Sequence, residues 1–410
     1  MSQSVFESLS EKANVIPVIR RIMADHLSPV LAYRRLVSPD NRTAPSFLFE
    51  SIENGNEVGR FSFLGANPSI ELVAFEQEVL IRNLELGTEE KIKCNNPLEK
   101  IRSISQQWSI SDPITKEDLP LPEFCGGWVG YAGYDSARYS EPQSIPFVSS
   151  PQDDRNLPDI HFALYKTIVV FDHVAKVIHA VHNAIIKDDS IEQSWLDANE
   201  KLDSLVCLLQ EDSINIPVGS ISIDLSKNPP IPECSNMNQA EFEQAVIRCK
   251  EYISKGDAFQ IVLSQRFEQH TSIDPFEIYR TLRVVNPSPY MIYLQAEGAI
   301  LTASSPEILC RVRNREVLNR PLAGTRKRGV SEEEDKRLES DLRSDEKERS
   351  EHVMLVDLGR NDLGTVCELG SVEISRLMDV ERYSHVMHLS STVRGKLSKN
   401  KDHWDALMAT

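Results

Sequence analysis

The stretch DEKERSEHVMLVDLGRNDLG, residues 345–364, carries the most informative pattern in this chain of 410 residues. Glu348, Glu351 and His352 are spaced at i, i+3 and i+4, so a helix places all three on one face. Two carboxylates arranged in this way can hold a hard cation through oxygen, directly or through water. A solvated charged helix is the commoner result of such spacing. Because HVMLVDL is strongly apolar, we expect this helix to enter a core and to carry its carboxylates to the border.

Two segments on either side of this helix contain further candidates. In NRPLAGTRKRG, residues 319–329, Gly324 has no side chain to keep a substrate carboxylate away from backbone N–H groups, and Thr325 adds a hydroxyl. A plain β-turn with a basic surface is the commoner interpretation of this segment. His388 lies in the apolar, extended segment YSHVMHLSS. Such a histidine is usually a satisfied core residue, but beside a metal and a pocket it could act as acid or base.

The first half of the chain has the pattern of antiparallel sheet. Residues 25–135 alternate short β-rich runs such as FLFESI and IELVAF with turn signals such as Glu53-Asn54-Gly55-Asn56. Residues 211–237 are rich in Ser, Pro and Asn and lack helical periodicity, so we interpret them as a linker.

The second half begins with a well-marked helix. Asn238 is the expected N-cap, Glu241 stands at the capping-box position and Gly256 ends the helix. A strand is expected over residues 260–267, and Asp274-Pro275 begins another helix. Since helices and antiparallel strands segregate rather than alternate as βαβ units, the sequence predicts an α+β architecture.

Charge and composition exclude several classes of protein. With 45 Lys and Arg against 62 Asp and Glu the formal net charge is −17, which argues against a sequence-independent nucleic-acid binder. No apolar stretch reaches the length of a membrane span. The seven cysteines form no Cys-x-x-Cys pair, so neither structural zinc nor a disulfide framework is expected. The N-terminal residues resemble neither a secretory signal nor a transit peptide, which predicts the cytoplasm, or the plastid stroma if the protein is plastid-encoded.

Six segments taken together resemble one enzyme family. In order along the chain they are GDAFQIVLSQRF (257–268), NPSPYM (286–291), SSPEI (304–308), RPLAGTRKRG (320–329), DEKERSEHVMLVDLGRNDLG (345–364) and ERYSHVMHLSSTVRGKL (381–397). Their order and spacing are similar to those of the chorismate-utilising enzymes, and of anthranilate synthase component I in particular. The resemblance runs from about residue 28 to the end of the sequence.

The resemblance implies a two-domain β-sandwich core of antiparallel sheets with flanking helices. It implies an N-terminal regulatory domain over 25–175, a helix and linker over 176–237, and a chorismate-binding catalytic domain over 238–410. The implied reaction, the first step of tryptophan biosynthesis, converts chorismate and ammonia to anthranilate and pyruvate with Mg²⁺ as cofactor. The ammonia comes from glutamine through a separate amidotransferase subunit, component II.

Site residues follow from the resemblance by matching position. Glu351 is implied as a direct Mg²⁺ ligand, with Glu348 acting through water. Chorismate is implied to bind at Gly324 and Thr325, with Glu307 in the pocket and His388 as the acid or base of the elimination step.

Two positions separate branches of the family. Ala323 stands where the para-aminobenzoate relatives carry a nucleophilic lysine, and it cannot attack the ring. Gln260 stands where the isochorismate relatives place a lysine base, and a neutral amide cannot take a proton from water. Isochorismate synthase and aminodeoxychorismate synthase are therefore the disfavoured alternatives.

The N-terminal half also resembles a feedback site. FLFESIENG (47–55) and GRFSFLG (59–65) are similar to the family's tryptophan-binding segment. By position, the tryptophan site is implied to consist of Ser51, Pro289, Tyr290 and Met291. The alternative is that these strands and turns only join two sheets.

The family continues beyond the point where this sequence stops, through a second metal-binding helix and a Gly-rich segment. The resemblance therefore implies a C-terminally incomplete catalytic domain, either a fragment of a longer protein or a natural truncation, and inactivity of this chain alone is one of the open alternatives. A non-catalytic module that binds tryptophan or the amidotransferase is the second hypothesis.

Overall fold

The computed structural model describes residues 1–37, 44–51, 59–111, 122–186, 190–211, 216, 231–383 and 385–410. The chain divides into two compact units, Met1–Ile216 with Tyr279–Thr410, and Pro217–Ile278. Within the described ranges, the larger unit contains three antiparallel sheets and the smaller one a long helix and a two-stranded ribbon. None of the helices in these ranges is both long enough and apolar enough to cross a membrane.

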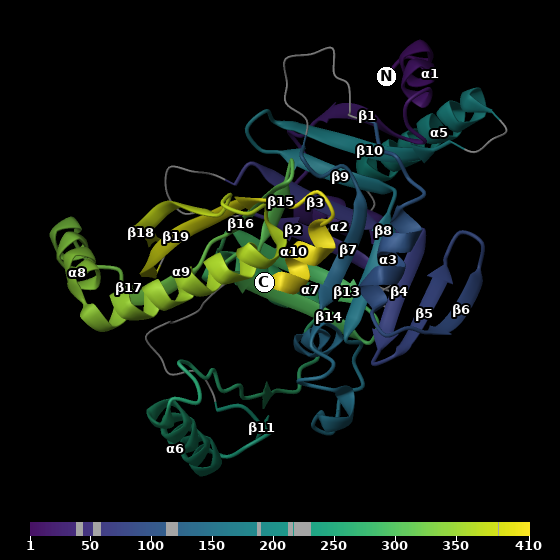
Figure 1. Ribbon diagram of the computed structural model, residues 1–410. Helices are drawn as coiled ribbons and strands as arrows, with labels where there is room; N and C mark the ends of the chain where they lie inside the picture. The colour runs from purple at the N-terminus through teal and green to yellow at the C-terminus, as the bar shows by residue number, and fades with distance from the viewer. Residues whose placement is uncertain are drawn as a thin grey trace. The chain divides into compact units, whose positions relative to one another are not determined.

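The first sheet has seven strands in the order β1-β10-β9-β3-β2-β13-β14, and all neighbours are antiparallel (Figure 1). Segments far apart in sequence meet here, because β2 pairs with β13 and β3 with β9. The strands are β1 (Val15–Met23), β2 (Ser46–Glu50), β3 (Phe61–Ala66), β9 (Thr167–Asp172), β10 (Val177–Ile185), β13 (Tyr290–Ala296) and β14 (Ala299–Ser305).

The second sheet packs against the first to make a sandwich. Its order is β6-β5-β4-β8-β7, again antiparallel. The core between the sheets holds Phe47 and Leu294 from the first sheet and Ala163 and Tyr165 from the second. The predicted β-sandwich of antiparallel sheets is thereby confirmed. The strands are β4 (Ile70–Phe75), β5 (Glu78–Asn83), β6 (Thr88–Lys93), β7 (Gly127–Ala132) and β8 (Ile160–Tyr165).

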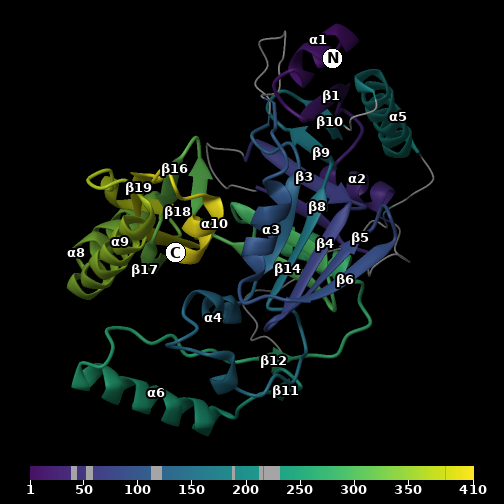
Figure 2. The same cartoon turned by 45° about the vertical axis from the view of Figure 1, so that its right-hand side comes forward.

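Helices cover the outer faces of the sandwich. On the first sheet, α5 (Ile191–Gln210) contacts β10 and α2 (Pro29–Leu36) contacts β3. The buried residues of α5, Ala198, Leu202, Leu205 and Leu209, recur at helical spacing, which gives this helix one apolar face. Helix α3 (Pro97–Ser105) lies over the second sheet (Figure 2). The described part of the N-terminal half also contains the short helices α1 (Gln3–Ser10) and α4 (Ala137–Ser140) and two 3-10 helices, Tyr134–Ser136 and Phe147–Ser149.

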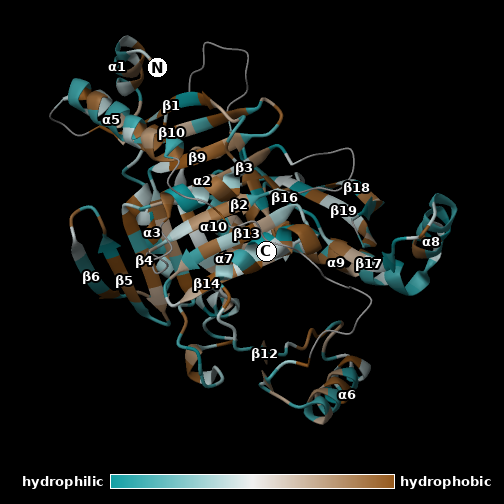
Figure 3. Ribbon diagram, turned by 180° about the vertical axis from the view of Figure 1, so that it is seen from behind, coloured by the Kyte–Doolittle hydropathy of each residue, from teal (hydrophilic) through white to brown (hydrophobic). Residues whose placement is uncertain are grey.

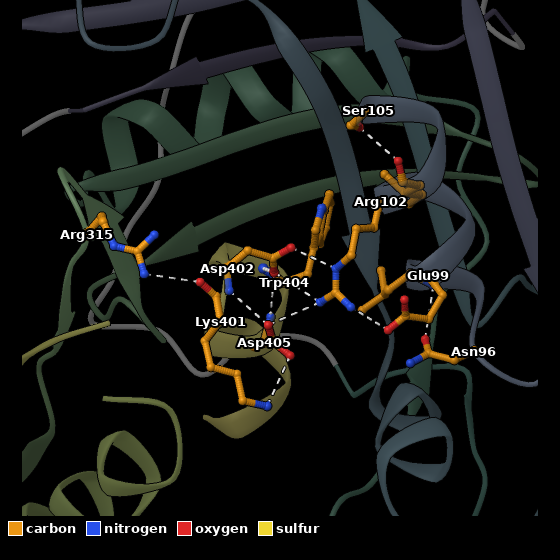
Figure 4. Close-up of polar contacts among 11 residues, drawn as sticks. Asn96, Glu99, Arg102, Ser105, Arg315, Lys401, Asp402, Trp404 and Asp405 are labelled. Carbon is orange, nitrogen blue, oxygen red and sulfur yellow. Dashed lines mark hydrogen bonds and ion pairs between the residues drawn. The ribbon is translucent and has the colours of Figure 1, made fainter. Parts of the chain in front are cut away.

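The C-terminal helix α10 (His403–Ala409) joins the sandwich to the third sheet. Arg102 of α3 donates two hydrogen bonds to Asp402, at 2.7 Å from Nε and 3.0 Å from Nη2, and Figure 4 shows the two side chains facing each other. Trp404 is buried beside Phe162, with ring centroids 5.2 Å apart, in the cluster that α3 covers. Two positions later, Ala406 belongs to the core under α9. One helical turn thus contributes to both cores.

The third sheet is built on β19 (Val386–Lys396), which pairs with β16 (Glu316–Asn319) and β17 (Leu322–Lys327) along one edge and with β18 (Glu373–Arg382) along the other. A short strand, β15 (Arg311–Arg313), extends the sheet beyond β16. Helices α8 (Glu332–Ser344) and α9 (Glu346–Val366) contact β17 and β19. Hydropathy separates the two helices, because α8 is almost entirely hydrophilic whereas α9 carries apolar stretches (Figure 3). The predicted helix over 345–364 is confirmed and enters a core.

The smaller unit confirms one prediction and corrects another. Helix α6 (Gln239–Lys255) has the expected capping box between Asn238 and Glu241, and Gly256 ends it with a φ of 83°. The strand expected over 260–267 is wrong except at its end, since only Phe267–Glu268 forms a strand, β12, which pairs with β11 (Cys234–Ser235). The helix after Asp274 is confirmed as α7 (Pro275–Val285).

Candidate active site

The centre of the candidate site is a bulge in β17 at Gly324. The pairing register of β17 with β19 shifts between Ala323 and Thr325, and Gly324 has a φ of +68°, which a residue with a Cβ rarely adopts. A Cβ at Gly324 would lie 3.1 Å from Leu342 Cδ1 and 3.3 Å from Glu348 Oε2. The glycine therefore lets the carboxylate of Glu348 on α9 approach the backbone of β17.

Thr325 and His388 face each other across the β17–β19 pair. Nδ1 of His388 lies 3.1 Å from Thr325 Oγ1 and 3.2 Å from the carbonyl oxygen of Gly324. A carbonyl oxygen can only accept, so this arrangement fits a proton on Nδ1 and leaves the lone pair on Nε2. The ring of Tyr383 stands edge-on to His388, with centroids 5.6 Å apart. His388 is thus oriented by backbone and hydroxyl oxygens rather than buried in an apolar core.

Glu307 is also brought to β17. Its Oε1 accepts a hydrogen bond of 3.0 Å from the backbone N–H of Leu322, and its backbone carbonyl accepts one of 3.1 Å from Ser305 Oγ. These contacts hold the turn after β14 against the first residue of β17. Glu307 therefore lies beside the start of the strand that carries Gly324 and Thr325.

The two candidate metal ligands lie in the first turns of α9. Asp345 caps this helix by accepting a hydrogen bond of 3.1 Å from the backbone N–H of Glu348. That bond and the Arg326 guanidinium lower the pKa of the Asp345 carboxyl. Arg326 Nη1 also lies 3.5 Å from Glu348 Oε1.

These carboxylates fit a metal only in part. No group of three or more His, Cys, Asp or Glu side chains in the described ranges is arranged to hold a metal ion. Mg²⁺, however, typically takes one or two protein carboxylates and keeps water or substrate oxygens for the rest. Glu348 and Glu351 lie one helical turn apart on α9, with Glu348 beside Gly324 of β17, and two carboxylates are enough for that requirement.

The basic run after Thr325 serves the fold rather than forming an open basic surface. Arg326 binds Asp341 and Asp345, each at 2.7 Å, and thereby ties β17 to the start of α9. Arg328 and the backbone N–H of Gly329 bind Asp335, and the Arg328 guanidinium is the main reason that the pKa of Asp335 falls to about 2. The sequence reading missed these pairs. The alternation of side chains along a strand was a signal for them, because it places Arg326 and Arg328 together on the face opposite Thr325.

The segments of the expected tryptophan site lie next to each other. Ser51 follows β2 directly, and β2 pairs with β13 so that Glu50 is opposite Met291, which is fully buried. Ser51 fits tightly, because a Cβ at Gly59 would lie 2.4 Å from Ser51 Oγ. Pro289 and Tyr290 precede Met291 at the start of β13. Residues 52–55 of the expected segment lie outside the described residues.

Glu50 is a buried acid that the sequence reading overlooked. It accepts hydrogen bonds of 2.7 Å from the hydroxyl of Tyr279 and 3.0 Å from Nη2 of Arg283, both on α7. Burial, followed by the nearby Glu50 charge, raises the pKa of Tyr279. The acid directly before Ser51 is therefore tied to the helix that leads into NPSPYM.

Gln260 belongs to the smaller of the two units, whereas the other predicted catalytic residues belong to the larger one. It lies in a stretch without regular secondary structure, and not on the expected strand. Cavities of about 700 Å³ and about 380 Å³ border the sandwich, and none of the predicted site residues lines them. The structure therefore brings together Gly324, Thr325, His388, Glu307 and Glu348, and it leaves Gln260 as a prediction from sequence.

Comparison with known proteins gives a consistent result. Residues 44–410 match the family model described as chorismate binding enzyme. The chain is 50% identical over 407 residues to anthranilate synthase alpha subunit 1, chloroplastic, of Oryza sativa subsp. indica, a match that covers 98% of this chain and 70% of the relative. It is 39% identical over 402 residues to anthranilate synthase component 1 of Acetivibrio thermocellus, covering 98% of this chain and 78% of that one.

A solved structure supports the same assignment. Anthranilate synthase component I from Streptococcus pneumoniae TIGR4 superposes with a TM-score of 0.68 at 34% identity, covering 95% of this chain and 79% of that one. The resemblance drawn from the six segments is thereby confirmed. This chain belongs to the chorismate binding enzyme family, among the anthranilate synthases of the component I or alpha-subunit type.

Proposed function

We propose that this chain carries the chorismate site of an anthranilate synthase and converts chorismate and ammonia to anthranilate, pyruvate and water. The observation that supports it most is the meeting of Gly324, Thr325, His388 and Glu348 at the bulge of β17. Ammonia adds at C2 of the ring as the 4-hydroxyl leaves. Loss of the C2 proton and cleavage of the bond to the enolpyruvyl oxygen then give the aromatic ring and release pyruvate.

His388 is the group that we assign to the proton transfer. Its Nδ1 faces the Gly324 carbonyl, so Nε2 can accept the C2 proton. The backbone around Gly324 and the hydroxyl of Thr325 would receive a substrate carboxylate. Mg²⁺, bound by Glu351 directly and by Glu348 through water, would neutralise negative charge on the substrate.

Ala323 and Gln260 support ammonia as the nucleophile. The methyl group of Ala323 is buried in β17 opposite Leu389 and cannot form a covalent intermediate with the ring. Gln260 cannot act as the base that activates water. Ammonia needs no such activation, which favours the amination branch.

The direct test is incubation of the chain with chorismate, an ammonium salt and Mg²⁺ at neutral pH. The expected result is the fluorescence of anthranilate, which His388→Ala lowers by about a hundredfold or more. Formation of isochorismate would contradict the proposed reaction. Absence of any turnover, with tryptophan binding retained, would support the non-catalytic module instead.

We further propose that tryptophan binds at the β2–β13 pairing and inhibits the enzyme. The support is the adjacency of Ser51 to Glu50 and the pairing of Glu50 with Met291. Calorimetric titration should show tryptophan binding to the chain, and Ser51→Ala should weaken that binding about tenfold through loss of one hydrogen bond. Equal binding by both proteins would remove Ser51 from the site.

We also propose a partner protein and a compartment for this chain. We propose that the partner is a glutamine amidotransferase, component II. Adding this protein to the chain should let glutamine replace the ammonium salt as the source of nitrogen. No anthranilate from glutamine in the presence of the amidotransferase would contradict the proposal. The sequence left two compartments, the cytoplasm and the plastid stroma. The name of the rice relative describes that protein as chloroplastic, which supports the plastid stroma.

A further inference from the structure

A polar contact fixes α9 to the third sheet beside the candidate metal ligands. Nε2 of His352 lies 2.6 Å from Oγ of Ser391, and both residues are fully buried. The same oxygen accepts a hydrogen bond of 2.9 Å from the backbone N–H of Met378 on β18. Ser391 Oγ therefore links three elements, α9, β19 and β18. These elements lie together in Figures 1 and 2.

The position of this contact along α9 is informative. His352 directly follows Glu351 and lies one turn after Glu348, whose carboxylate reaches Gly324 on β17. The first turns of α9 are thus held at two points, by the ion pair of Arg326 on β17 with Asp345 and by the contact of Ser391 on β19 with His352. Glu351 lies between these points, so its direction depends on the rotation of the helix about its own axis.

Docking of the helix alone does not require a hydrogen bond here. Val356, Leu363 and Val366 of α9 are buried in an apolar cluster with Val317 and Val393. Apolar contacts of this kind resist removal of the helix but tolerate small rotations and shifts. A hydrogen bond of defined length between buried groups tolerates much less, because breaking it leaves both groups unsatisfied.

We propose that His352, held by Ser391, is a positioning residue that sets the orientation of Glu351 for binding a divalent cation. The inference rests on the proposed Mg²⁺ site. Residues that hydrogen-bond a metal ligand directly typically change metal affinity by about 10- to 100-fold when they are replaced. His352 acts on Glu351 through the helix, so we expect an effect at the lower end of that range.

The test measures binding of Mn²⁺, a paramagnetic substitute for Mg²⁺, to the chain without substrate by electron paramagnetic resonance. Ser391→Ala should raise the dissociation constant for Mn²⁺ about tenfold. His352→Gln, whose side-chain amide can donate or accept at the position of Nε2, should stay within about threefold of the parent, whereas His352→Leu should match or exceed the loss in Ser391→Ala. Val356→Ala, one turn further along α9, is the control that loosens packing without touching the hydrogen bond.

Each outcome bears on a different claim. Suppose that Glu351→Gln abolishes Mn²⁺ binding, so that the metal site is valid. An unchanged dissociation constant in Ser391→Ala, or an equal loss of affinity in Val356→Ala, would then overturn the positioning role of His352. If the parent chain bound no Mn²⁺, or if Glu351→Gln bound it normally, the proposed metal site itself would be wrong, and the role of His352 would fall with it.

Discussion

Helices α6 and α9 have the same kind of N-cap but differ in how many of their residues are buried. Asn238 caps α6 by accepting a hydrogen bond of 3.0 Å from the N–H of Glu241, and Asp345 caps α9 by accepting one of 3.1 Å from the N–H of Glu348. Yet no residue of α6 is buried among the described parts of the chain, whereas α9 buries five, His352, Val356, Gly359, Leu363 and Val366. Local sequence decides where a helix begins, but not what covers it.

The largest expected difference between the two helices concerns packing. Leu363→Ala removes a fully buried side chain from α9 and should lower the free energy of unfolding by about 2–5 kcal/mol. Ile247→Ala on α6, where the side chain is 48% exposed, should change it by about 0.5 kcal/mol or less. Urea denaturation followed by circular dichroism measures both. Similar losses in the two variants would show that α6 is buried against something in solution.

The next prediction asks whether α9 differs from α6 in function as well as in packing. Glu351→Gln should reduce Mg²⁺-dependent turnover by about a hundredfold or more, because the neutral amide is a poor ligand for a hard cation. Glu346→Gln, in the exposed first turn of the same helix, is the matched control and should retain the parent rate. The assay follows anthranilate fluorescence across a Mg²⁺ titration, and normal turnover by Glu351→Gln would refute its assignment as a ligand.

A smaller effect is expected from the cap of α6. Asn238→Ala removes one half of the capping box and should cost about 1 kcal/mol of helix stability. Because α6 has no buried side chain among the described residues, the cap should matter relatively more there than in a helix held by a core. Hydrogen exchange of the first-turn amides measures the loss, and unchanged protection would mean that other contacts hold this end.

The smallest expected difference between the two helices is the pH dependence of the stabilisation by their N-caps. The pKa of Asp345 is lowered in the fold, first by the N–H of Glu348 and then by Arg326. Its stabilising effect is therefore complete above the ordinary Asp pKa of 3.8 and is lost as pH falls below that value, whereas the neutral cap Asn238 does not titrate. Unfolding of the parent and of Asp345→Asn, compared from pH 6 to pH 3, should show a gap that closes on acidification. A gap that stayed constant would exclude the carboxylate as its source.

Much of the sandwich followed from alternation and turn signals. The runs between residues 47 and 84 form β2 to β5, because each has apolar residues that a core can bury. Those of β2 and β3 pack against the second sheet, and those of β4 and β5 pack in the cluster that α3 covers. The same logic failed at 260–267. Val262 in this segment and Phe259 just before it are 84% and 91% exposed, since a strand needs a neighbouring strand and apolar residues do not supply one.

The candidate site was only partly accessible from sequence. The i, i+3 spacing predicted that Glu348 and Glu351 share a helical face, and a glycine before Thr325 predicted a close approach of the backbone. The pairs Arg326 with Asp345 and His352 with Ser391 were not predicted, because their partners are 19 and 39 residues apart. Only the pairing of β17 with β19 and the packing of α9 over both strands bring them together.

The sequence by itself determined the family, the helix starts, most strands and the residue types available for chemistry, since these depend on local spacing and composition. Tertiary structure decided which charges are paired, which glycine admits a carboxylate and which helix is buried. Those outcomes depend on contacts between distant segments, such as Thr325 with His388 or Arg102 with Asp402, and local sequence carries no information on such contacts.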